Sequence, residues 1–246
     1  MVWGMALPRG GGPYGPYGDY EGPVDIYGDG WGHRLKRYFS EKMPPDERAI
    51  HGNDLGEGAH WYRSFAIGKF THECGTKDGP DRLPYTPIEN HEPPRFFQCE
   101  KGYKALAAIV SLPNRVWAVS DSFKSIVELL DPAAHYFFPI EMRMPRGKSY
   151  PEMYHIVVFD RYLDSFSPTD SREGAATGNG PGRYSLYHRS KSEVTGLAFS
   201  KADFGGAHMW RERGFGEWLT CFSDELVAKL NEASLWLPKH YRMREI

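Results

Sequence analysis

The chain carries one pattern twice, and this repeat constrains its fold more than any other feature. Each copy is an apolar run followed by Ser-Asp and then by apolar residues at helical spacing, and the two copies span residues 116–123 and 218–226. Apolar residues that recur at i, i+3, i+4 and i+7 are typical of a helix with one buried face. Ser120 and Ser223 are suitable N-caps, and the Asp after each places negative charge at the positive end of the helix dipole. The pattern predicts two units, each a strand that runs into a capped helix.

An extended segment rich in aromatic residues and proline follows each predicted helix. These segments span residues 136–144 and 235–243. We expect the two units to form the skeleton of the C-terminal half of the chain, with Leu230 in its core. Neither unit carries a group of side chains typical of an active site.

The composition is that of a globular protein with a high aromatic content. Of 246 residues, 40% are hydrophobic, 25% are charged and 15% are aromatic, which suits a β-rich core or an extensive recognition surface. The net charge of −2 argues against a dedicated nucleic-acid-binding protein.

Cysteine usage and hydropathy indicate a cytoplasmic protein. Cys74, Cys99 and Cys221 form a sparse, odd set, which predicts free thiols in a reducing compartment. The sequence shows no signal-peptide pattern, and no stretch approaches the roughly 18 apolar residues of a membrane span.

The first thirty residues contain nine Gly and four Pro and have neither a helical nor a strand period. Such a segment buries little apolar surface by itself. Two interpretations stay open: a loosely ordered arm that lies on the body, or a segment of Tyr and acidic residues that becomes ordered on a partner. In either case we expect residues 14–30 to contribute little to stability.

Local composition predicts an α+β fold with a mixed or antiparallel sheet, a few packed helices and a Pro/Gly-rich N-terminal portion. The expected elements are strands at 60–67, 95–99 and 154–159, helices at 34–39 and 103–110, a hairpin of 185–188 with 194–199, and a Pro-rich loop at 71–94. We divide the chain into an irregular N-terminal region, residues 1–100, and an α+β body, residues 101–246.

Common catalytic and metal-binding motifs are missing from the sequence. It contains no G-x-S-x-G elbow, no Walker-type loop and no H-E-x-x-H. His72 and Cys74 have no second ligand pair at zinc spacing. We therefore expect no enzyme activity, no cofactor and no metal. The alternative is a small hydrolase that uses a cluster drawn from His188, His208, His240, Asp160 and Asp164.

Several short motifs, taken in order, resemble a known family. They are Val119-Ser120-Asp121, residues 135–140, Asp164-Ser165-Phe166-Ser167, residues 206–211 and Phe222-Ser223-Asp224. This order is similar to that of bacterial immunity proteins of polymorphic toxin systems, in family eleven of that group, formerly a domain of unknown function. The resemblance covers about residues 115–235. It implies an antidote that binds and blocks a toxin domain inside the bacterium that makes it, and it carries over no catalytic residues.

An antidote of this kind needs exposed aromatic and charged anchors. The N-terminal segment and the Pro-rich loop supply the predicted partner-binding residues, which are Tyr14, Tyr17, Asp19, Tyr20, Glu21, Asp25, Tyr27, Asp29, Tyr85, Glu89 and Glu92. If the toxin is a nuclease, the acids of the N-terminal segment would face its cationic substrate cleft, which chiefly speeds association. A toxin effector domain is the expected partner, rather than nucleic acid or a membrane. A scaffold protein without a toxin partner is a further alternative, and the sequence leaves the oligomeric state open.

Overall fold

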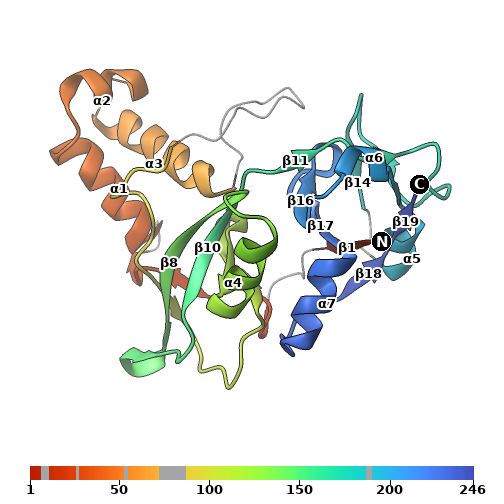
Figure 1. The fold of residues 1–246 in the computed structure, drawn as a ribbon. Helices are drawn as coiled ribbons and strands as arrows, with labels where there is room; N and C mark the ends of the chain where they lie inside the picture. Colours follow the sequence, from red (N-terminus) through yellow and green to blue (C-terminus); the bar gives the residue numbers. More distant parts are fainter. Residues whose placement is uncertain (7–10, 26–27, 53–54, 72–86, 187–189) are drawn as a thin grey trace.

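Two mixed sheets organise the structure (Figure 1), a computed structural model that describes residues 1–6, 11–25, 28–52, 55–71, 87–186 and 190–246. The first sheet has seven strands, which lie in the order β2 (Gly18–Tyr20), β5 (Phe96–Cys99), β8 (His135–Met144), β10 (Tyr154–Phe159), β7 (Trp117–Ser120) and β6 (Ile109–Ser111), with β9 (Lys148–Ser149) paired to β8. The second has five, in the order β11 (Tyr162–Leu163), β16 (Met209–Glu212), β17 (Leu219–Ser223), β1 (Val2–Ala6) and β18 (His240–Arg242).

Smaller sheets and the helices complete the α+β architecture. The small sheets are β12 (Phe166–Ser167), β15 (Ala198–Phe199) and β19 (Arg244–Glu245); β13 (Thr177–Gly178) and β14 (Tyr184–Ser185); and β3 (Pro23–Asp25) and β4 (Gly28–Asp29). The helices are α1 (Gly30–Glu41), α2 (Pro45–His51), α3 (Leu55–Thr71), α4 (Asp121–Leu130), α5 (Lys191–Gly196), α6 (Lys201–Phe204) and α7 (Asp224–Glu232), with 3₁₀ turns η1 (Pro113–Arg115), η2 (Pro145–Gly147) and η3 (Arg213–Trp218). Parallel pairs such as β5 with β8 occur among antiparallel ones, so the predicted α+β class with mixed pairing is confirmed.

Both Ser-Asp units fold as predicted, with a strand that runs into a capped helix. The Ser120 hydroxyl accepts a hydrogen bond from the Phe123 amide at 3.3 Å, and the Ser223 hydroxyl accepts one from the Leu226 amide at 3.0 Å. Each bond satisfies one of the amides that a helix leaves without a partner in its first turn. Leu230 is fully buried, which confirms its predicted place in the core.

The similarity of the two units extends to four neighbouring strands in each large sheet. The strands β8, β10, β7 and β6 lie next to one another around α4 as β18, β1, β17 and β16 do around α7. His155 of β10 faces Val119 across the strand pair, and Trp3 of β1 faces Phe222. Val119 and Phe222 each directly precede the capping serine of their unit, so the strand registers of the two units correspond.

The aspartates that follow the serines make equivalent contacts in the two units. Asp121 pairs through its carboxylate with Nε2 of His155 at 2.9 Å, and Asp224 accepts from Nε1 of Trp3 at 2.9 Å. His155 and Trp3 occupy the corresponding positions of β10 and β1, so a ring nitrogen from the neighbouring strand contacts the first turn of each helix. The chain therefore contains a structural repeat of four strands and one helix.

The two copies of the repeat differ in the position along the chain of one of their four strands. In the first, β10 follows β8 along the chain, but its counterpart β1 is the first strand of the chain and lies between β17 and β18. The interpretation of the N-terminus as a loose arm is therefore wrong. Val2 and Met5 are fully buried, because they belong to two different apolar clusters that β1 contacts.

The segment around Tyr20 is also part of the core. This side chain is fully buried, its ring meets that of Trp31 edge-on at 4.8 Å, and its hydroxyl donates to the Pro113 carbonyl at 2.9 Å. Burial of an aromatic ring with a satisfied hydroxyl is a large stabilising term. The expectation that residues 14–30 contribute little to stability is contradicted by this packing.

Three other local predictions are wrong, and three are confirmed. Residues 60–67 belong to helix α3 rather than to a strand, residues 103–108 are irregular rather than helical, and residues 191–196 form α5 rather than part of a hairpin. The strands predicted at 95–99 and 154–159 and the helix predicted at 34–39 are present as β5, β10 and part of α1. The Pro-rich loop falls largely outside the described residues, which resume at residue 87.

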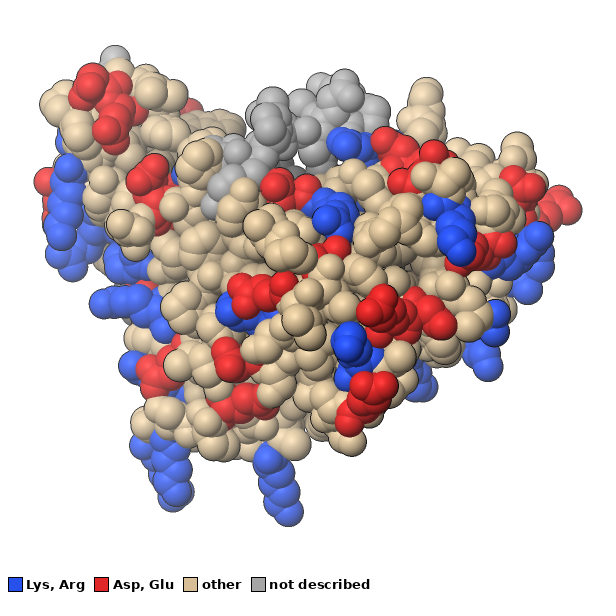
Figure 2. Space-filling view, viewed as in Figure 1, with Lys and Arg blue, Asp and Glu red and all other residues tan. Residues whose placement is uncertain are grey.

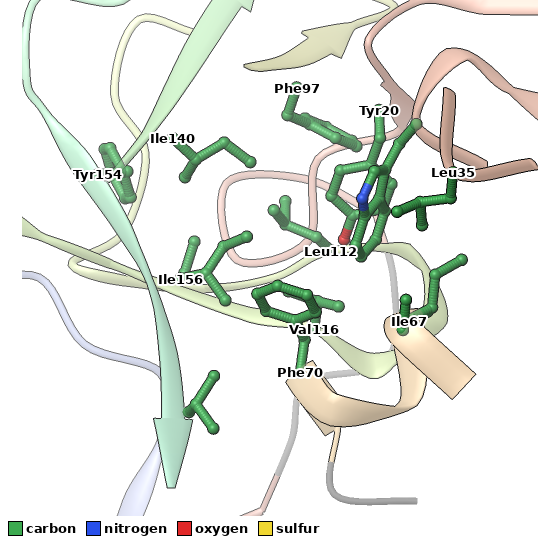
Figure 3. Packing of buried hydrophobic residues seen from close by; sticks show 14 of the residues in the cluster. Tyr20, Leu35, Ile67, Phe70, Phe97, Leu112, Val116, Ile140, Tyr154 and Ile156 are labelled. Carbon is green, nitrogen blue, oxygen red and sulfur yellow. The ribbon is translucent and has the colours of Figure 1, made fainter. Parts of the chain in front are cut away.

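Apolar side chains form three clusters, of which the largest joins the N-terminal helices to the seven-stranded sheet. Figure 3 shows Phe70 of α3 beside Ile156 of β10 and Val116, with Tyr20 and Leu35 on the side of the N-terminal segments. A second cluster lies between the two large sheets and contains the apolar faces of α4 and α7, and a third lies in the C-terminal part.

Pairing crosses the boundary that was drawn at residue 100. Strand β5 precedes it and pairs with β8, and strand β1 pairs with β17 and β18. Independent folding of either region stays a prediction.

Polar contacts to buried backbone groups connect the two large sheets. Asp131, which directly follows α4, accepts from the amides of His208 and Met209 at 2.9 and 2.8 Å. Nε2 of His135 in β8 lies 3.0 Å from the Met209 carbonyl oxygen. The two sheets are therefore joined by directed hydrogen bonds as well as by apolar packing.

Within the part of the chain that the structure describes, none of the helices combines the length and apolar character needed to cross a membrane. Cys99 and Cys221 are free and buried, as expected, and burial raises the pKa of the Cys99 thiol to about 11. Cys74 lies outside the described residues.

Candidate partner-binding surface

The predicted partner-binding residues have very different environments. Tyr20 is fully buried and Glu92 is 1% exposed, so the prediction that these two side chains present a surface to a partner is wrong. Tyr17 is 53% exposed and Glu89 is exposed, whereas Tyr14 is half-buried with its ring 5.1 Å from that of Trp236.

The remaining predicted residues divide into two groups. Asp19 is half-buried in edge strand β2, and Glu21 directly follows that strand. Tyr27 and Tyr85 lie outside the described residues, and so do the side chains of Asp25 and Asp29, whose backbones belong to β3 and β4.

Glu21 leads to a groove between α1 and residues 91–96, which we call the α1 groove. Its volume is about 470 Å³, within the range of ligand pockets. Its lining consists of Glu21, Gly30, His33, Arg34, Arg37, Tyr38, Glu41, Lys42, His91, Arg95 and Phe96. Figure 2 shows Lys and Arg side chains gathered along the left edge of the molecule, over α1.

Glu21 anchors one wall of the groove. Its carboxylate oxygens lie 2.9 and 3.1 Å from Nε of Arg34, and they also accept from the Arg95 amide at 3.0 Å and the Arg95 guanidinium at 3.2 Å. Burial would raise the pKa of Glu21, but the hydrogen bonds from Arg34 and Arg95 outweigh it, so the pKa is lowered. Glu21 is therefore an ionised, internally neutralised group and does not present free negative charge.

Arg34 fixes the opposite wall to α1. Its guanidinium donates to the carbonyl oxygens of His91 and Pro93, the latter at 2.8 Å. Charge-assisted bonds of this kind hold their partners in a defined geometry. The segment that carries His91 and Arg95 is therefore tied to the helix.

A buried ion pair ties the segment that lines the groove to helix α3. Nζ of Lys69 on α3 lies 2.7 Å from Glu92, and both side chains are at most 5% exposed. The same carboxylate accepts from the Glu89 amide at 2.8 Å, and the Glu92 carbonyl oxygen accepts from Nε1 of Trp31 at 2.7 Å. Burial raises the pKa of Glu92 even though the Lys69 ammonium opposes that shift. This residue is thus a structural link between α1, α3 and residues 87–95.

Aromatic rings form the inner wall of the groove. The His91 imidazole stacks on Tyr38 with 3.5 Å between ring centroids, and its Nε2 lies 2.5 Å from the Tyr62 hydroxyl. Burial lowers the pKa of His91, so the imidazole is neutral at pH 7. A neutral Nε2 can accept a hydrogen bond from the Tyr62 hydroxyl.

The histidines of the hydrolase alternative do not come together. His208 directly precedes β16 and contacts the Ser223 hydroxyl at 2.8 Å, and His240 lies on β18. Strands β17 and β1 lie between them, so at about 4.8 Å per strand the backbones of these two residues are at least about 14 Å apart. Asp164 pairs with Arg213 at 3.1 Å, and His188 lies outside the described residues. Among the side chains that are described, no cluster of three His, Cys, Asp or Glu residues is arranged to hold a metal ion.

Sequence reasoning missed most of the α1 groove. Glu21 was predicted as a site residue, but Arg37, Tyr38, His91 and Arg95 were not. A weak signal exists in the basic and aromatic residues near 34–42, since positions three and four apart share a helix face. The contribution of residues 91–96 depends on a tertiary contact and leaves no local pattern.

Comparison with known proteins gives a result that covers most of the chain. A family model described as "Immunity protein family (Imm11)" matches residues 38–243. No curated protein matches the chain. The matched region contains both Ser-Asp units, part of α1 and the segment that closes the α1 groove.

Proposed function

Because this chain belongs to the Imm11 immunity protein family, we propose that it neutralises one cognate bacterial toxin by direct, reversible binding at equal molar ratio. The family match over residues 38–243 is the observation that carries this function. We place the event in the cytoplasm of the bacterium that makes the toxin. The protein acts as a stoichiometric inhibitor that covers the toxin's active site rather than as an enzyme that repairs damage.

Exposed aromatic and apolar side chains of the N-terminal region, residues 1–100, can anchor such an interface. Trp61 of α3 is 58% exposed, Ile50 of α2 is 80% exposed, and Tyr17 before β2 is 53% exposed. Trp, Tyr and Arg side chains supply most of the binding energy of tight interfaces. The predicted residues Tyr17, Asp19 and Glu89 remain part of the proposed surface, together with the α1 groove.

One of the N-terminal acids that were expected to face the cationic cleft of a nuclease toxin is not available for this role. Glu21 is neutralised by Arg34 and Arg95, so it offers no negative charge to a cationic cleft. We therefore propose inhibition by occlusion without assigning the toxin to the nucleases.

Co-expression with the toxin encoded beside this gene tests the function. Cells that make the toxin should survive only with this protein present, and the purified toxin domain should be fully inhibited at about equal molar ratio. Light scattering after gel filtration should show a complex of defined stoichiometry. A variant that fails to bind but still protects, or protection at far below equimolar concentration, would contradict neutralisation by binding.

A further inference from the structure

The α1 groove combines positive charge with a fixed shape. Its lining holds four cationic side chains and two carboxylates, an excess of two positive charges in a protein whose net charge is −2. A positively charged groove on a protein with a negative net charge favours a partner group that carries negative charge.

The exposed cations of the groove are available to a partner. The Arg37 side chain is 65% exposed, and Lys42 is exposed as well. Arg37 reaches Glu41 at 3.4 Å, but an exposed pair of this kind contributes only about 0–1 kcal/mol. A carboxylate brought by a partner can therefore replace that contact at little cost.

The groove is preorganised, which distinguishes it from a loose cationic patch. Arg34 and Arg95 are bound to Glu21, and Glu92 ties residues 87–95 to Lys69. Tyr38 and His91 are stacked at the inner wall. A surface that is already ordered loses little conformational entropy on binding.

We propose that the α1 groove receives a carboxylate-bearing segment of the toxin, whose Asp or Glu side chains pair with Arg37 and Lys42 while its apolar atoms rest on Tyr38. This inference rests on the proposed function and specifies the chemistry of the toxin's contact surface. A protein segment fits better than a small anion, because Arg34 directs its donors into the fold and the available cations lie at the exposed rim.

Charge reversal at Arg37 and Lys42 tests the proposal. Both residues are exposed, with Arg37 in the C-terminal half of α1 and Lys42 directly after the helix, so R37E/K42E should fold. The matched control is K104E/K239E, which changes the net charge equally at two exposed lysines outside the groove. Affinity for the purified toxin domain would be measured by calorimetry at low and high salt, with thermal unfolding as a check on folding.

At 50 mM salt the groove variant should bind about tenfold or more weakly, with a smaller salt dependence, and the control should bind like the wild type. Asp or Glu to Lys changes in the toxin segment should restore binding to R37E/K42E. Unchanged affinity of R37E/K42E would overturn the groove assignment while leaving the proposed function intact. Failure of the wild type to bind the toxin would refute the proposed function and the groove assignment together.

Discussion

His135 holds its imidazole neutral between two backbone groups. The Asp160 amide lies 3.4 Å from Nδ1 and the Met209 carbonyl oxygen lies 3.0 Å from Nε2. Hence Nε2 carries the proton, and a second proton on Nδ1 would face an N–H group. Burial lowers the pKa of His135 from 6.5 to about 4.

This shift predicts sensitivity to mild acid. The unfolded chain takes up a proton near pH 6.5 that the native state refuses until about pH 4, so stability is lost as pH falls through that window. The loss from this group should approach about 3 kcal/mol. In urea unfolding at pH 7 and pH 4.5, His135→Gln should be less stable at pH 7 and should lose about 2–3 kcal/mol less than the wild type on acidification. An equal loss in both proteins would assign the acid sensitivity to other groups.

Glu92 allows a second prediction for a single residue. Its removal leaves the Lys69 ammonium buried without a carboxylate, which typically costs about 3–5 kcal/mol. Glu92→Ala should therefore lower the free energy of unfolding by that amount in chemical denaturation. The paired variant Lys69→Met/Glu92→Leu should recover most of the loss, because it removes both charges. If Glu92→Ala changes stability by less than about 1 kcal/mol, the pair does not link the helices as described.

At the scale of elements, the two capped helices offer a matched comparison. Leu230 of α7 is fully buried, whereas Leu129 of α4 is 70% exposed. Leu230→Ala should destabilise the protein by about 2–5 kcal/mol, as the loss of a buried leucine does. Leu129→Ala should stay within about 0.5 kcal/mol. Equal effects in thermal unfolding would contradict the assigned helix faces.

The repeated units were predictable because cap, charge and apolar spacing all indicated the same structure. Helix α3 was not, because Trp61, Tyr62 and Phe65 are typical of strands by composition, while the helical spacing of buried Tyr62, Ala66 and Phe70 carried the correct signal. Helix α5 begins with a capping box of Ser190 and Glu193, a local signature that outweighs strand-like composition.

Residues 103–108 could not be assigned from sequence for a different reason. The amides of Ala107 and Ala108 donate to the carbonyl oxygens of Pro13 and Trp236. Both partners are distant in sequence, so no local period reveals them. The α1 groove was missed for the same reason, because residues 91–96 meet α1 through contacts that are distant in sequence, such as those of Arg34 and Tyr38 with His91.

At the scale of the whole molecule, the repeat is completed by a strand from the other end of the chain. A fragment of residues 101–246 lacks β1, β2 and β5, and it therefore loses one of the three interior strands of the five-stranded sheet. We expect this fragment to show no cooperative unfolding transition in circular dichroism, in contrast to the full chain. A sharp transition near the wild-type temperature would show that the C-terminal region folds by itself.

Strand β1 has a further consequence for the supply of antidote. Trp3 meets Asp224, which is 221 residues later in the sequence. At a synthesis rate of about 5–20 residues per second, the ribosome needs roughly 12–48 s to complete the strands between which β1 lies. During that interval β1 lacks the two strands with which it pairs, so the five-stranded sheet cannot form. Under the proposed function, the toxin is therefore met only by molecules whose synthesis is already complete, which favours continuous production of this protein over synthesis on demand.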